Sequence, residues 1–313
     1  MRRPRCVLPF QVAVYHIFSR VVDRLFRLDD EMKDSSRDLV WKVARFSGVE
    51  VITYAIMSNH FHVLVRVQPV WTVVNENEVL ERVETLYGHA KKQWLKNRLG
   101  HFRQAGRHAE AEALLDSFRR RMNNVSEFMK TLKLRMTIEF NKKHERIGTL
   151  WESRFGSILV EDMPNCELLR LTAAYIDLNP VRAGIVRDPS KYNWNGFSDA
   201  SLTKPKRAGW ARKGIAGLYR NMAGRELEAY GKLLRARAFK KAPSGKKDLP
   251  GALPLTDLHV RNDTFMRGKV IGSLAFITKV LGSRPAGGVA QCHVGQDGPV
   301  LVAGCLTRRK HRA

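Results

Sequence analysis

Two histidines, His60 and His62, stand one residue apart in an apolar stretch of the chain. The alternation around them predicts a β-strand, on which residues i and i+2 point to the same face. Both imidazoles then project together, while Phe61 and Val63 face the core. Two adjacent imidazoles without an acidic partner suit a divalent metal ion. The same spacing also occurs by chance on strands whose histidines face solvent, so the pair alone does not decide between these interpretations.

A second pair, Tyr175 and Asn179, lies in a leucine-rich segment that ends at Pro180. Residues four apart are neighbours on one face of a helix. A phenol acts as a covalent nucleophile in some enzymes, and the amide oxygen of Asn179 could complete a metal site begun by two histidines. A tyrosine on a helix this apolar is also explained as a core residue.

Basic and aromatic residues flank the predicted strands. Arg20 follows the first strand, Trp151, Arg154 and Phe155 precede the last one, and Arg182 follows the proline. Aromatic faces stack unpaired bases and arginines contact phosphates, so this mixture fits single-stranded nucleic acid. Burial in the core explains Trp151 and Phe155 equally well.

The elements that must position these residues follow from periodicity and turn signals. Asp29 or Asp30 is suited to cap the first helix, Gly48 to end it, and Asp162 to cap the last one. The predicted strands are 12–18, 49–57, 60–67 and 155–160, and the predicted helices are 29–46, 76–121, 125–140 and 162–178. This order predicts an α+β fold, a ferredoxin-like split βαβ with one antiparallel sheet and helices on one face.

Charge divides the chain unevenly. The sequence holds 55 Lys and Arg against 30 Asp and Glu, a net charge of +25, and residues 204–313 alone hold 23 against 6. Such an excess indicates a polyanionic partner, because every neutralised phosphate releases a condensed counterion. We predict a domain at 1–203, with 76–121 as a helical insertion, and a basic, mainly helical accessory region at 204–313. Lys240 to Pro254 is typical of a linker.

Composition excludes several classes of protein. With 44% hydrophobic and 27% charged residues the chain is expected to be globular. Its longest stretch without a charged residue, Val51 to Val65, is too short and too polar to cross a membrane. Without a signal peptide or a CxxC pair, we expect a cytoplasmic, nucleoid-associated protein. A zinc site from Cys292, His293, Cys305 and His311 matches no common spacing.

The motifs together resemble one family. Ser-Asn-His-Phe-His at 58–62 and Tyr-Ile-Asp-Leu-Asn-Pro-Val-Arg-Ala-Gly at 175–184 resemble the REP-associated tyrosine transposases, a branch of the single-tyrosine HUH transposases. Tyr-His-Ile-Phe-Ser-Arg at 15–20 and Trp-Glu-Ser-Arg-Phe at 151–155 are similar to two further blocks of that family, in the same order. The segment at 265–276 is similar to the C-terminal block of its longer members.

The resemblance implies roles for particular residues. His60 and His62 match the metal-binding pair, Tyr175 matches the nucleophile, and Asn179 matches the polar third ligand. Many relatives have histidine where this chain has Asp177, which leaves the role of Asp177 open. Arg20, Asn59, Arg154 and Arg182 are predicted to contact DNA.

The implied activity is that of a metal-dependent tyrosine DNA transposase, an endonuclease and strand-joining enzyme in DNA transposition and recombination. It cleaves and rejoins single-stranded, hairpin-flanked DNA through a 5′-phosphotyrosine, with Mg²⁺ or Mn²⁺ as cofactor. The alternatives are a catalytically inactive, domesticated protein that binds single-stranded or hairpin DNA, and a metal-dependent hydrolase without a covalent step. The sequence leaves open whether the chain acts alone or as a homodimer.

Overall fold

The computed structural model describes residues 6–163, 167–203, 206–219, 222, 224–238, 270–281, 289–293 and 299–303. The linker predicted at Lys240 to Pro254 lies outside these residues. Cys305 and His311 of the zinc alternative also lie outside them, so that alternative stays a prediction.

Within the described residues, seven strands form one sheet in the order β2-β3-β1-β4-β5-β7-β6. The first four strands are antiparallel neighbours, so Phe18 of β1 lies opposite His62 of β3 and Gly156 of β4. This is the predicted split βαβ core, and the α+β class is confirmed. The strands are β1 Ala13–Arg20, β2 Glu50–Ile56, β3 His60–Val67, β4 Gly156–Val160, β5 Val270–Gly272, β6 Val289–His293 and β7 Pro299–Ala303.

The prediction of one purely antiparallel sheet was wrong. β5 pairs with β4 in parallel, with Val160 opposite Ile271, and β7 and β6 continue the sheet beyond it. These strands come from the basic region after residue 203. A strand of three residues is too short to be recognised by alternation in a sequence.

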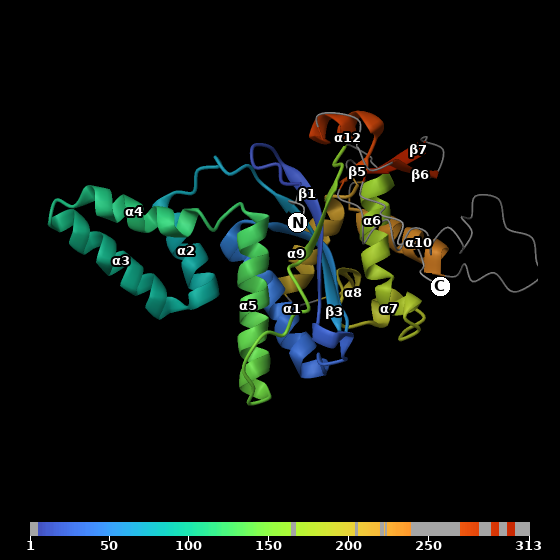
Figure 1. Ribbon diagram of the computed structural model, residues 1–313, viewed down its shortest axis with the longest axis horizontal. Coiled ribbons are helices and arrows are strands. Elements are labelled where there is room, and N and C mark those ends of the chain that lie inside the picture. Colours follow the sequence, from blue (N-terminus) through green and yellow to red (C-terminus); the bar gives the residue numbers. More distant parts are fainter. Residues whose placement is uncertain are drawn as a thin grey trace, which may run out of the picture.

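Helices cover both faces of the sheet, not one (Figure 1). α1 and α5 lie on one side, and α6 lies on the other. Successive side chains of a strand point to opposite faces of the sheet, and both kinds are buried here, as His16 and Ile17 of β1 show. Both faces of the sheet are therefore covered. The helices are α1 Asp30–Ser47, α2 Glu76–Tyr87, α3 His89–Gln104, α4 His108–Arg119, α5 Val125–Lys143, α6 Glu167–Asp177, α7 Asn179–Arg182, α8 Gly196–Ser201, α9 Lys206–Ala216, α10 Glu226–Ala238 and α12 Leu274–Leu281.

The ends of α1 follow the predicted signals. Asp29 caps it by accepting a hydrogen bond from the Met32 amide at 2.9 Å. Gly48 ends it with a φ of 64°, a left-handed conformation that glycine adopts without strain. The predicted 76–121 insertion is also helical, and its three helices α2, α3 and α4 project from the α1 and α5 side (Figure 1).

The last predicted helix differs from expectation at its C-terminal end. On its N-terminal side, the carboxylate of Asp162, the predicted cap, pairs with the Arg66 guanidinium at 2.8 Å. The helix was predicted to end at residue 178, yet Asn179 begins the short helix α7 with Pro180 in its first turn. Leu178, with φ −86° and ψ 0°, lies between the two helices. Pro180 thereby starts a new helical turn.

The region after residue 203 contacts the core directly. α9 packs against β2, and a Cβ on Gly214 would lie 2.3 Å from the Val51 carbonyl oxygen, so only glycine permits this approach. The short strand β5 is buried against β4. The boundary predicted at residue 203 stays a prediction, while α9, α10 and β5 form part of the packed body.

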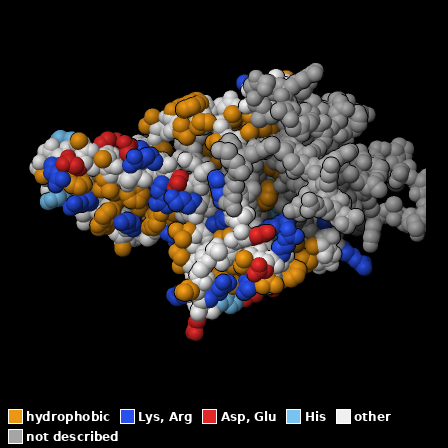
Figure 2. All heavy atoms as spheres, viewed as in Figure 1, with side chains coloured by type: hydrophobic (Ala, Val, Ile, Leu, Met, Phe, Trp, Pro, Cys, Tyr) orange, Lys and Arg blue, Asp and Glu red, His pale blue; other side chains and the backbone are white. Residues whose placement is uncertain are grey.

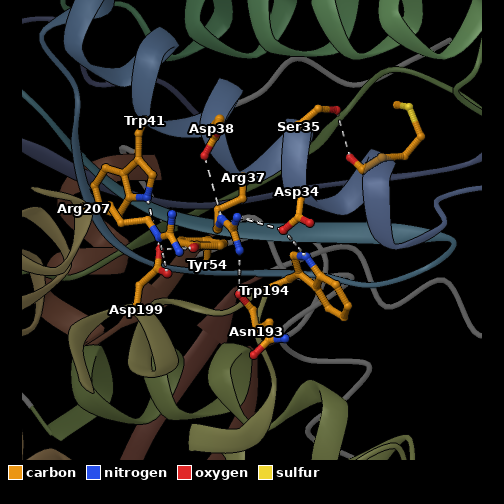
Figure 3. Close-up of polar contacts among 11 residues, drawn as sticks. Asp34, Ser35, Arg37, Asp38, Trp41, Tyr54, Asn193, Trp194, Asp199 and Arg207 are labelled. Carbon is orange, nitrogen blue, oxygen red and sulfur yellow. Dashed lines mark hydrogen bonds and ion pairs between the residues drawn. The ribbon is translucent and has the colours of Figure 1, made fainter. Parts of the chain in front are cut away.

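A buried polar cluster joins α8 to α1, β2 and α9 (Figure 3). The Asp199 carboxylate is 1% exposed and accepts hydrogen bonds from the Tyr54 hydroxyl and the Trp41 indole. The Arg207 guanidinium of α9 supplies the opposite charge at 2.9 Å. Burial, and then the neighbouring carboxylate, raise the pKa of Tyr54 well above its ordinary value. The cluster therefore fixes the C-terminal helices to the core.

Among the described residues no helix is long and apolar enough to span a membrane.

Candidate active site

The histidine pair projects from one face of β3. The His60 and His62 ring centroids are 5.1 Å apart, with the rings nearly perpendicular at 86°. His60 is half-buried and its Nδ1 meets Asn59 Oδ1 at 2.6 Å. His62 is 1% exposed, and its Nδ1 meets His16 Nε2 at 2.9 Å. Both rings are thus held through Nδ1, the arrangement by which proteins orient imidazoles that bind through Nε2.

Burial keeps both imidazoles neutral. It lowers the pKa of His60 to about 4, with a further contribution from the charge of Arg20. Burial and then His16 lower the pKa of His62 well below its ordinary value. A neutral imidazole is the form that binds a metal ion. The pair is therefore in its ligand form at neutral pH.

Tyr175, on α6, lies beside the two histidines although it is far from them in the sequence. Its ring lies edge-on to His62, with centroids 5.9 Å apart at 88°, and is also 5.9 Å from the ring of His16. The side chain is 9% exposed, and burial raises its pKa, although Arg182 and Arg20 oppose that shift. The phenol is therefore protonated at neutral pH.

Asn179 reaches the histidines from α7, one turn beyond Tyr175. Its Nδ2 donates hydrogen bonds to the carbonyl oxygens of Tyr175 at 3.1 Å and Ile176 at 3.3 Å. A hydrogen-bond contact in which this side chain acts as the acceptor raises the pKa of the His60 imidazole. Since Nδ2 is engaged with the backbone, the amide oxygen is the atom that faces His60.

These residues line one open cleft of about 530 Å³. Of the sequence-predicted site residues, Tyr175, His60, His62, Asn179, Arg20, Arg154 and Arg182 line it. Asn59 is not among the lining residues, since its side chain holds His60 and donates to the Arg24 carbonyl oxygen at 3.0 Å. Tyr175 thus lies in the same cleft as His60 and His62, although more than a hundred residues separate them in the sequence.

The arginines surround the tyrosine. The guanidinium carbon of Arg182 lies 4.1 Å from the Tyr175 ring centroid, and its Nη2 donates to the Tyr175 carbonyl oxygen. Burial lowers the pKa of Arg182 to about 10, which leaves it charged. Arg20 lies close enough to affect the pKa of both His60 and Tyr175. The cleft is therefore positive and suited to a phosphate.

The donor set fits a divalent cation in its chemistry. Neutral imidazoles are borderline ligands that suit transition metals, and an amide oxygen is a hard ligand of the kind that suits Mg²⁺ or Mn²⁺. Among the described residues, no group of three or more His, Cys, Asp or Glu side chains is arranged to hold a metal, so this site would depend on Asn179. The guanidiniums of Arg20 and Arg182 oppose a lone cation, and a bound phosphate would offset them.

Asp177 does not belong to the site. It is fully buried and accepts hydrogen bonds from Thr53 of β2, Tyr230 of α10 and the backbone N–H of Phe197. The question left open by the sequence is therefore answered. Asp177 joins α6 to its neighbouring elements.

The predicted base-stacking aromatics belong to the core, since Trp151 and Phe155 are both buried. The Trp151 indole donates to the Lys133 carbonyl oxygen at 3.1 Å, and its ring contacts Phe61. Of the two interpretations that the sequence allowed for Trp151 and Phe155, the core interpretation is confirmed.

Three features of the site were missed. Glu152 adds an acidic residue to the lining of the cleft. Its position inside the Trp-Glu-Ser-Arg block was a usable signal. His16 positions His62, which the pairing of β1 with β3 could have indicated. Phe18 also lines the cleft, and a Cβ on Gly156 would lie 2.2 Å from its ring, so this glycine lets β4 pass the aromatic ring.

Comparison with known families finds a match within about the N-terminal third of the chain. Residues 10–106 match the family described as "Transposase IS200 like". This segment carries the IS200-like transposase sequence. The predicted resemblance is thereby confirmed at the level of this family. The matched range includes His60 and His62, whereas Tyr175 and Asn179 lie beyond it.

The chain was also compared with solved structures and with curated proteins. A structure titled "Structure of the REP associates tyrosine transposase bound to a REP hairpin" is 14% identical, with a TM-score of 0.39. The match covers 63% of this chain and 84% of the other. The search of curated proteins finds no match to this chain.

Proposed function

We propose that this transposase cleaves and rejoins single-stranded DNA through a covalent bond between Tyr175 and a 5′-phosphate. The observation that supports the proposal is the convergence of Tyr175 with His60, His62 and Asn179 in one arginine-lined cleft. A protein that only binds DNA does not need a phenol against two neutral imidazoles.

In the proposed reaction the Tyr175 phenol oxygen attacks the phosphorus of one phosphodiester. A bond forms between phosphorus and the phenol oxygen, and the bond from phosphorus to the 3′-oxygen of the preceding nucleotide breaks. The phenol loses its proton and the leaving 3′-oxygen gains one, so the products are a 5′-phosphotyrosine and a free 3′-hydroxyl. One phosphodiester replaces another, so the step requires no nucleotide energy source. Attack by a different 3′-hydroxyl reverses the step and joins the strands.

The residues around the phenol have distinct roles in this proposal. Arg20, Arg154 and Arg182 hold the phosphate and offset its charge. Arg182 also lies over the Tyr175 ring, where its charge favours the phenolate. His60, His62 and Asn179 would hold Mg²⁺ or Mn²⁺, which supplies Lewis-acid polarisation of the phosphate when bound.

The experiment is an adduct assay with the full chain. Hairpin oligonucleotides with single-stranded flanks, labelled on the 3′ side, are incubated with protein and Mg²⁺ or Mn²⁺ and then denatured. A labelled band at the mass of the protein plus DNA supports the proposal. The absence of a band across varied hairpins with both metals would contradict it.

The second candidate is a DNA-binding protein without catalytic activity. The low exposure and raised pKa of the Tyr175 phenol favour it, because a protonated, buried phenol is a poor nucleophile. This candidate predicts tight binding of the same hairpins and no adduct. The hydrolase alternative predicts cleavage that survives Tyr175→Phe.

A further inference from the structure

α3 is the basic helix of the three-helix insertion. Its sixteen residues include five Lys or Arg and no Asp or Glu. Leu95, Leu99 and Phe102 are buried and anchor one face of the helix on α2 and α4. The rest of the helix faces solvent, and Figure 2 shows Lys and Arg side chains over this lobe.

Acidic residues of the insertion form ion pairs with two of the cations of α3. Lys92 pairs with Glu84 at 2.5 Å, and Arg103 pairs with Glu76. In the described part of the chain, no ion pair joins Lys91, Lys96 or Arg98 to an acid. These three positive charges are therefore available to a partner.

The exposed residues form a crest with two flanks. At about 100° per residue, Gln93, Asn97 and Gln104 fall along the line opposite the buried face. Arg98 falls on one side of that crest and Lys96 on the other, while the half-buried Lys91 lies closer to the buried face. The crest therefore carries amide side chains, with Arg98 on one flank and Lys96 on the other.

Aromatic contacts brace one flank. The Lys91 ammonium lies 3.4 Å from the ring centroid of Trp94, which is itself 47% exposed. The Arg98 guanidinium lies 4.5 Å from the Phe102 ring. These contacts restrict two long side chains and so lower the entropy lost on binding.

The pattern matches the chemistry of a duplex groove. A major groove about 12 Å wide admits an α-helix, and phosphates line both of its edges. Cations on both flanks reach the two backbones, while Asn and Gln on the crest face base edges. Gly100 also lies on this outer side, where nothing lies within 4 Å of its Cβ position. An acidic protein would not require amides that lie between cations on two flanks.

We propose that the outer face of α3 binds duplex DNA as a second contact, apart from the catalytic cleft. The insertion projects from the α1 and α5 side, whereas Tyr175 is carried by α6 on the opposite face of the sheet (Figure 1). Duplex DNA beside the single-stranded substrate would then be held by α3. The inference rests on the proposed function only in taking DNA as the partner.

The test compares two full-length triple variants with equal loss of charge. The test variant carries Lys91→Gln, Lys96→Gln and Arg98→Gln. The control carries Lys42→Gln, Lys130→Gln and Lys142→Gln, which are exposed residues of α1 and α5. Binding of a fluorescein-labelled 20-base-pair duplex is measured across a salt series, after thermal melting shows that both variants are folded.

We expect the salt slope of the test variant to fall by up to about 2.7, or ~0.9 for each lost phosphate contact. The control should keep the wild-type slope. A single acid on the crest, Asn97→Glu, should also weaken duplex binding without disturbing the buried face. Equal slopes in both triple variants, together with wild-type binding by Asn97→Glu, would overturn the proposal.

The adduct assay on the wild-type chain reports on Tyr175 separately. If no adduct forms but the α3 variants lose duplex binding, the catalytic proposal fails and this one stands. If the adduct forms and the α3 variants bind duplex like the wild type, only the α3 proposal fails.

Discussion

At the scale of single residues, the proposed chemistry depends on one phenol. Tyr175 combines a raised pKa with a position against His62 and Arg182. Tyr175→Phe keeps the ring contacts and removes only the oxygen that would attack. We expect the covalent adduct to disappear while hairpin affinity stays close to that of the wild type, measured by a denaturing gel and by fluorescence anisotropy. Cleavage that persists in this variant would instead favour the hydrolase alternative.

The proposed metal ligands make a separate prediction. Chelation by EDTA should abolish the adduct, and added Mn²⁺ or Mg²⁺ should restore it, because the proposed attack requires a polarised phosphate. His60→Ala should lose this response to metal. DNA binding should largely persist in EDTA, since Arg20, Arg154 and Arg182 contact the phosphate without a cation. An adduct that forms equally well in EDTA would refute the metal role.

At the scale of elements, α6 is held in place by the carboxyl group of Asp177. This group accepts hydrogen bonds from Thr53 and Tyr230, at 2.7 and 2.6 Å, and from the Phe197 amide. Burial raises its pKa to about 6 from an ordinary value of 3.8. The folded state thus binds this proton more tightly than the unfolded state. The stabilisation is complete below pH ~4, falls as the pH rises to about 6, and is absent above that, a change of roughly 3 kcal/mol.

Asp177→Asn tests this account. An amide has no charge to desolvate, and it can donate to the two hydroxyl oxygens while accepting from the Phe197 amide. The free energy of unfolding of the variant, relative to the wild type, should therefore rise between pH 4 and 6 and then level off. Urea denaturation at a series of pH values measures it. Tyr230→Phe removes one donor to the carboxylate and should shift the wild-type transition to higher pH, whereas parallel pH profiles in all three proteins would contradict the assignment.

The sequence predicted the elements better than their packing. The caps at Asp29 and Gly48 and the shared face of His60 and His62 are local properties, and all were found. Asp162 was assigned as a cap because nothing local shows its partner Arg66, which is 96 residues away. The place of α6 on the second face of the sheet, and the role of Asp177, depend likewise on elements distant in the chain. Family motifs predicted the convergence of Tyr175 with the histidines, which spacing alone could not do.

At the scale of the whole molecule, positive charge gathers in three regions of a chain whose net charge is +25. Arginines line the cleft, cations flank the crest of α3, and 23 Lys and Arg follow residue 203. Removing all of 204–313 would not isolate the last group. It would uncover β2 where α9 packs and remove the Tyr230 hydrogen bond to Asp177.

Substituting lysines of the predicted linker tests the basic region without that damage. Lys240, Lys241, Lys246 and Lys247, all changed to Gln, remove four charges from a short basic stretch after α10. If these lysines contact phosphates, the salt slope for single-stranded DNA should fall by up to about 2.8, or ~0.7 per contact.

Contacts made by independent surfaces add, so joining this set to the α3 triple variant should lower the duplex slope by the sum of the two separate effects. A combined effect no larger than that of the α3 variant would mean that the lysines of 240–247 do not contact the same DNA, and an unchanged single-strand slope would remove them from the binding surface altogether.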